Sequence, residues 1–129
     1  MDRKKYDLEE RLITFACTCL EICDLLPNSK AAQNLSYQLS KSSTAAALNY
    51  GEAQAAESPA DFIHKLKVVL KEIRESRVNL RIISNKPLLK GEKPNNALNE
   101  CTQLMAIFIS SIDTAKRNNS NLDSEKKVS

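Results

Sequence analysis

Hydrophobic residues recur at alternating spacings of three and four along most of the chain, which is the period of an α-helix with one buried face. The pattern predicts four helices, over residues 6–25, 30–56 and 59–84 and from an Asn95 or Asn96 cap to residue 116. Each helix carries one apolar stripe, and the stripes have similar lengths. They predict an all-α protein, an antiparallel up-down-up-down four-helix bundle.

The stripes are the predicted core. In the first helix the stripe is Leu8, Leu12, Phe15, Cys19, Ile22 and Leu26. In the second helix it thins toward small side chains, as Ala32, Leu35, Leu39, Ser42, Ala46, Asn49 and Ala53. In the third helix it is Phe62, Leu66, Val69, Ile73, Leu80 and Ile83. In the fourth helix it is Leu98, Cys101, Met105, Phe108, Ile112 and Ala115.

Breaks in the pattern mark the ends of the helices. Pro27 ends the first helix, and Ser58-Pro59 is a strong start signal, because serine caps free N–H groups and proline tolerates the first helical position. The polar composition after Arg117 cannot bury enough surface to order itself. We therefore expect one bundle domain over residues 1–117 and a disordered tail over residues 118–129.

Composition supports this fold and narrows the function. With 2 Gly and 4 Pro the chain lacks the turns of a many-stranded β protein. The net charge is +3, and the tail after Ala115 supplies two of these charges, so the body is too weakly basic for a dedicated nucleic-acid binder. No apolar run is long enough to span a membrane. The four cysteines suit a reducing, cytoplasmic setting.

The segment from Asn49 to Glu75 is the most distinctive part of the sequence. An Asn49-x-x-Glu52 turn precedes the Glu57-Ser58 helix start, and the run Phe62-Ile63-x-Lys65-Leu66 follows. These motifs resemble those of the four-helix-bundle family named after proteins encoded in 23S rRNA intervening sequences. The likeness spans all four predicted helices.

That resemblance has implications for assembly. Members of the family are small bacterial proteins that assemble as rings of five, and the accessory proteins of diversity-generating retroelements look like relatives that bind nucleic acid. The resemblance implies a homo-oligomer, by likeness a pentamer, that has no catalytic activity. It leaves contact with RNA or DNA open as an alternative function.

Catalytic and metal chemistry have little support in the residues. His64 has Asp61 one turn before it, but no nucleophile accompanies the pair, so an exposed helical histidine is favoured. Cys17, Cys19 and Cys23 lie within one helix instead of on the turns where zinc ligands converge. We therefore predict no enzyme activity, no metal and no cofactor.

Asn49 and Glu52 form a polar candidate pair. Helical spacing places Asn49 on the apolar face of the second helix, where a buried carboxamide fixes register and oligomer state at a cost in stability. The alternative is that Asn49 and Glu52, one turn apart, contact a ligand.

The third helix offers two candidate surfaces outside its core stripe. The first is apolar and predicts an oligomer interface formed by Ile63, Leu70, Val78 and Ile82. The second is basic and is either a solvated face or a nucleic-acid contact formed by Lys67, Lys71, Arg74 and Arg81. Because few aromatic residues remain outside the predicted core, base stacking is not expected.

Overall fold

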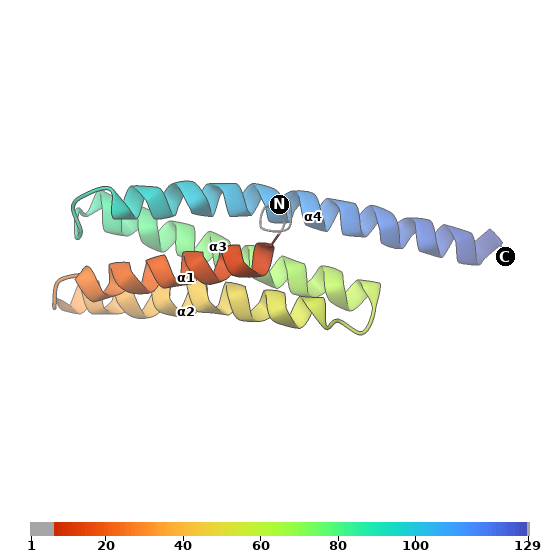
Figure 1. Ribbon diagram of the computed structural model, residues 1–129, viewed down its shortest axis with the longest axis horizontal. Coiled ribbons are helices and arrows are strands. Elements are labelled where there is room, and N and C mark those ends of the chain that lie inside the picture. The colour runs from red at the N-terminus through yellow and green to blue at the C-terminus, as the bar shows by residue number, and fades with distance from the viewer. Residues whose placement is uncertain (1–6, 129) are drawn as a thin grey trace.

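Four α-helices make up the computed structural model, which describes the backbone of residues 7–128 and the side chains of residues 7–122. The helices are α1 (Leu8–Leu25), α2 (Lys30–Gln54), α3 (Pro59–Asn85) and α4 (Lys93–Val128). Successive helices run in opposite directions and lie side by side (Figure 1). Within the described residues there is no strand. The predicted all-α four-helix bundle is therefore confirmed.

The predicted stripes meet in one core along the bundle axis. Leu12, Leu39, Ile73 and Phe108, one from each helix, have no exposed surface. The ring of Phe108 packs edge-on against Tyr50, with centroids 5.6 Å apart. Because each helix buries one face, the stripes close on one another and the opposite faces remain outside.

The helices begin where local capping favours them. Asp7, Ser29 and Ser58 each accept a hydrogen bond from the backbone N–H three residues later. Ser58 accepts from the amide of Asp61 at 3.0 Å, and Pro59 fills the first helical position as predicted. In the loop before α4, Gly91 has φ of 103°, a left-handed conformation that glycine adopts without strain.

Helix ends differ from the sequence prediction mainly in α4. This helix begins at Lys93 and not after Asn95 or Asn96, because Pro94 is tolerated in the first turn, where its missing N–H costs nothing. The residue predicted to begin the first helix, Tyr6, lies outside the described residues. The end of α1 and both ends of α2 and α3 lie within two residues of their predicted positions.

The C-terminal part of α4 includes most of the residues that were predicted to form a disordered tail. The helix continues past residue 116 to Val128 and projects beyond the loop between α2 and α3 (Figure 1). No Gly or Pro interrupts it after Pro94, and Asp113 pairs with Arg117 at 3.4 Å on the next turn. The predicted boundary at residue 117 thus falls inside one continuous helix, with Ser129 outside the described residues.

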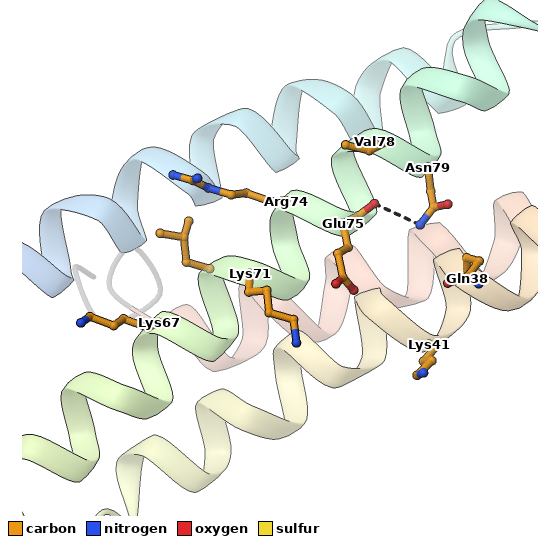
Figure 2. Close-up of a pocket in the computed structure, with 9 residues that line it drawn as sticks. Gln38, Lys41, Lys67, Lys71, Arg74, Glu75, Val78 and Asn79 are labelled. Carbon is orange, nitrogen blue, oxygen red and sulfur yellow. Dashed lines mark hydrogen bonds between the residues drawn. The ribbon is translucent and has the colours of Figure 1, made fainter.

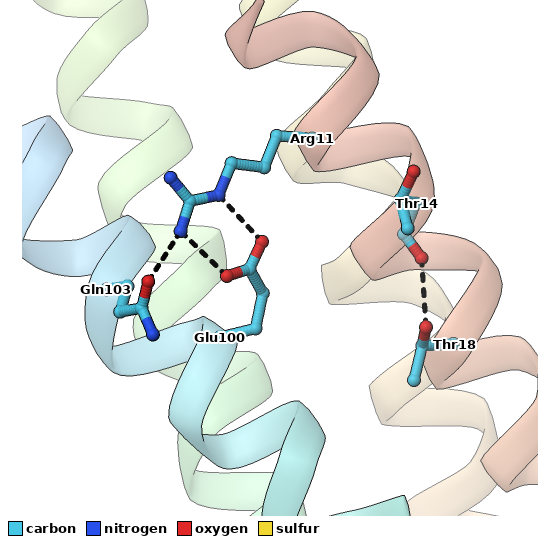
Figure 3. A network of polar contacts seen from close by, with 5 residues as sticks. All are labelled: Arg11, Thr14, Thr18, Glu100 and Gln103. Atoms are coloured by element: carbon cyan, nitrogen blue, oxygen red, sulfur yellow. Dashed lines mark hydrogen bonds and ion pairs between the residues drawn. The ribbon is translucent and has the colours of Figure 1, made fainter. Parts of the chain in front are cut away.

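The seam between α1 and α4 is the least packed of the four helix pairs in contact. Polar contacts close it (Figure 3). The guanidinium of Arg11 donates from Nε and Nη2 to the two carboxylate oxygens of Glu100, both at 2.8 Å. Its Nη2 also donates to Gln103 at 2.8 Å. Lys93 adds an ion pair to Glu21 at 2.7 Å.

One polar pair lies inside the core. The hydroxyls of Ser42 on α2 and Ser76 on α3 are 2.7 Å apart, and both side chains are buried. Each satisfies the other, because one donates while the other accepts. The pair fixes the register of α2 against α3, because a shifted helix would leave both hydroxyls without this partner.

The two hydroxyls of this pair should not contribute independently to the stability of the bundle. We expect Ser42→Ala to lower the free energy of unfolding by about 1–3 kcal/mol, because the Ser76 hydroxyl then stays buried without its partner, whereas in Ser76→Ala the Ser42 hydroxyl can still donate to the carbonyl of Leu39. The double variant Ser42→Ala/Ser76→Ala should lose less than the two single losses added together. Urea denaturation followed by circular dichroism measures all three, with the exposed Ser120→Ala as a control expected within ~0.5 kcal/mol of wild type. Additive losses would contradict this account.

Candidate functional site

The outer face of α3 carries the predicted basic residues. Lys67, Lys71, Arg74 and Arg81 are all exposed. At about 100° per residue they fall on the side of the helix opposite Val69 and Ser76, which are buried in the core. The arrangement of α3 therefore matches the sequence prediction for this face, while its function stays a prediction.

A groove of about 710 Å³ runs beside these residues, between α3 and α2. It is lined by Gln38, Lys41, Lys67, Leu70, Lys71, Arg74, Glu75, Val78 and Asn79. Figure 2 shows Lys71 and Glu75 extending from α3 toward α2, while Lys67 and Arg74 extend away from it. The groove brings three of the four predicted cations together and leaves Arg81 outside its lining.

Lys41 is a member of this cluster that sequence reasoning missed. It comes from α2, one residue before Ser42, whose bond to Ser76 sets it opposite α3. Nothing in the sequence pattern of α2 alone marks Lys41, because the register between two helices is not visible in either of them.

The groove is positively charged. Its lining has four cations against one carboxylate, Glu75. The ion pairs of the described residues involve other side chains and leave these four cations to solvent. Burial raises the pKa of the neighbouring Glu72, and the carboxylate of Glu75 raises it further. An anion entering the groove would meet cations that no described carboxylate neutralises through an ion pair.

An exposed aromatic residue beside the groove corrects one expectation. Tyr37 on α2 is 62% exposed, and the ammonium of Lys41 lies 6.0 Å from the centre of its ring. Few aromatic residues lie outside the predicted core, and for that reason the sequence does not favour base stacking. Tyr37 lies four residues before Lys41, on the outer side of the same helix, so one stacking surface is available.

The predicted apolar interface on α3 divides in two. Ile63 is buried and has little free surface, whereas Leu70 is half-buried, packs partly against the core and also lines the groove. The packing of α4 along α3 widens the buried face beyond the stripe that spacing alone predicts. Val78 and Ile82, in contrast, remain 54% and 43% exposed.

A second exposed apolar row lies on α1 and was missed. Ile13 and Leu20 are each 40% exposed, and Cys17 between them is also exposed. Their spacing of four and three places them on one face, away from the Leu12 and Cys19 stripe. The spacing of these three residues is visible in the sequence. It was passed over because the core stripe already accounts for most of the apolar residues of α1.

The predicted polar pair Asn49 and Glu52 is not a buried register device. Asn49 is half-buried, and its Nδ2 donates to the carbonyl of Ala45 at 2.8 Å within its own helix. Glu52 is exposed and pairs with Lys65 of α3 at 3.0 Å. These bonds are made within the chain, and the buried polar role belongs to Ser42 and Ser76 instead.

The histidine lies outside the core that holds Cys19 and Cys101. His64 is exposed, and the carboxylate of Asp61 accepts from the amide of Glu57 at the helix start. Cys19 and Cys101 are buried, and burial raises the pKa of the Cys101 thiol to about 12. Among the described residues, no three His, Cys, Asp or Glu side chains gather where they could hold a metal ion. No described helix combines the length and apolar content of a membrane span.

Comparisons with known proteins agree with the fold. A crystal structure of a protein of unknown function from the S23 ribosomal protein family of Bacteroides thetaiotaomicron superposes with a TM-score of 0.75. The two sequences are 29% identical, over 81% of this chain and 96% of that one. No curated protein matches the chain. The model of the family described as 23S rRNA-intervening sequence protein matches residues 4–110, which include the resembling motifs and the whole α3 face. The chain belongs to the 23S rRNA-intervening sequence protein family.

Proposed function

We propose that this chain is a non-catalytic assembly protein whose subunits associate through apolar side chains outside the core. The observation that carries the proposal is the exposure of Val78 and Ile82, four residues apart on the outer face of α3. Nothing in the family or in the S23 neighbour indicates catalysis.

The arrangement of the exposed apolar residues supports a second surface, outside the core, that becomes buried when subunits associate. Single exposed apolar residues are ordinary, but here they form rows on two helices whose core stripes are already complete. Ile13 and Leu20 make the row on α1, and Val78 and Ile82 make the row on α3. Complete burial of an exposed aliphatic side chain contributes about 1.5–3 kcal/mol, so contact between the two half-exposed rows supplies part of the free energy that association requires.

The first prediction of this proposal concerns substitutions that replace the exposed apolar side chains of α3. Val78→Gln with Ile82→Gln should weaken association at least ~100-fold, because two buried aliphatic side chains are lost from each contact. Light scattering coupled to gel filtration should then give a mass near the 14.4 kDa of one chain, with the helical circular dichroism unchanged.

A matched control uses the same kind of change elsewhere. Ile109 on α4 is 47% exposed, and Ile109→Gln should leave the assembled mass as it is. A wild-type protein that runs as a single subunit at ~10 μM, where an assembly with a Kd of about 1 μM stays mostly associated, would contradict the proposal.

Nucleic-acid binding is the second candidate function, and the groove favours it specifically. Four exposed cations from two helices line one depression, where they could contact phosphate groups. Phosphate contacts carry most of the affinity of a binder that does not read sequence. In that case the cations of α3 would bind the phosphates of a nucleic acid and would not contact a neighbouring subunit.

Salt dependence tests this candidate. If Lys41, Lys67, Lys71 and Arg74 each contact a phosphate, raising salt from ~50 to ~200 mM should weaken duplex binding roughly a hundredfold. Fluorescence anisotropy with long DNA and RNA measures the slope.

Arg81 provides the control for charge. Lys71→Glu should reduce the affinity for the polymer strongly, whereas Arg81→Glu makes the same change in charge outside the groove lining and should reduce it less. Equal effects, or no binding by wild type at ~50 mM salt, would show that the basic face is only solvated.

A further inference from the structure

The outer face of α1 has a defined chemical pattern. Ile13, Cys17 and Leu20 form its exposed apolar centre. An exposed acid stands four residues beyond each end, Glu9 before Ile13 and Asp24 after Leu20. The one cation of the helix, Arg11, turns away to Glu100 of α4. This face is therefore apolar in the middle and acidic at both ends.

The outer face of α3 has the opposite charge. Val78 and Ile82 are its apolar part, and Arg74 stands four residues before Val78. Lys71 and Lys67 continue the row in the same direction, without an acid between them on this face. The nearest acid, Glu75, lies on the side toward α2 (Figure 2).

We propose that the α1 face of one copy packs lengthwise on the α3 face of the next copy, head to tail. The inference rests on the self-association proposed above and names the two surfaces that meet. When Ile13 or Leu20 covers Val78, the acid four residues beyond it lies opposite Arg74. This match holds for either relative direction of the helices, through Glu9 when they run parallel and through Asp24 when they run antiparallel.

Charge also disfavours the two-fold alternatives. Two α3 faces in contact would place Arg74 opposite its own copy when the helices run parallel and opposite Lys86 when they run antiparallel, and two α1 faces would oppose acids with acids. Like charges across an interface suppress that pairing. Contact between two different faces repeats from copy to copy, and it closes into a ring or grows as a filament.

A charge-reversal experiment tests which surfaces meet. Arg74→Glu with Lys71→Glu should weaken the assembly at least ~10-fold, because carboxylates then face Glu9 or Asp24. Adding Asp24→Lys to the same chain should restore the assembled mass if the helices run antiparallel, and adding Glu9→Lys should restore it if they run parallel. Light scattering at matched concentrations gives each mass.

The outcomes separate this inference from the proposed function. Lys90→Glu, an exposed change in the loop before α4, should leave the mass unaltered. An assembled wild type whose mass is insensitive to the α3 reversal, or is restored by neither rescue, would overturn the pairing of faces while leaving self-association standing. A single-subunit wild type would refute both.

Cys17 offers a second readout from the other face. It lies at the centre of the α1 row and is exposed in the single chain. Alkylation by iodoacetamide, located by peptide mass, should be at least ~10-fold slower in the assembled wild type than in Val78→Gln/Ile82→Gln, because a covered thiol reacts only from the dissociated fraction. Equal rates in the two proteins would overturn the proposal.

Discussion

A helix of ordinary length can bury only one face in a four-helix bundle, and this limit governs the rest of the structure. Residues advance about 100° at each step, so a stripe at three- and four-residue spacing fills the inward side. Leu12, Leu39, Ile73 and Phe108 show the result, since none retains exposed surface. Any further apolar residue must then find a different partner. Val78 and Ile82 are such residues, and for this reason they carry more functional information than the core does.

The same limit explains why most of the fold could be predicted from sequence. Apolar period is a local property, and so are the caps formed by Ser29 and Ser58. The predicted disordered tail rests on composition, whereas α4 continues as a helix through residues 118–128: with no Gly or Pro after Pro94, helix propagation adds one hydrogen bond for each residue fixed. Composition describes how much surface a segment can bury, but it does not decide where a helix already started will stop.

The candidate site was predicted only in the part that one helix contains. Lys67, Lys71 and Arg74 share a face by spacing alone, whereas Lys41 joins them through the register that Ser42 and Ser76 set. Ile63 also differs from its prediction, because it is buried and not part of an exposed surface. Its angle places it beside the basic row, yet it is buried, because the width of the buried face depends on where the neighbouring helix sits. Relations between helices are the information that a single sequence pattern lacks.

The seam between α1 and α4 links stability to assembly. α1 packs mainly on α2 and meets α4 through a few polar contacts, of which the Arg11 to Glu100 pair is partly exposed to water. Pairs with that exposure contribute little, so α1 is the helix held least firmly by the bundle. A partner that covers its outer face binds only when α1 is docked, and such binding stabilises the docked state by mass action. Assembly through α1 would therefore stabilise the fold at the seam between α1 and α4, which is the least packed. An interface made of two α3 faces would instead stabilise a helix that is already well packed on its neighbours.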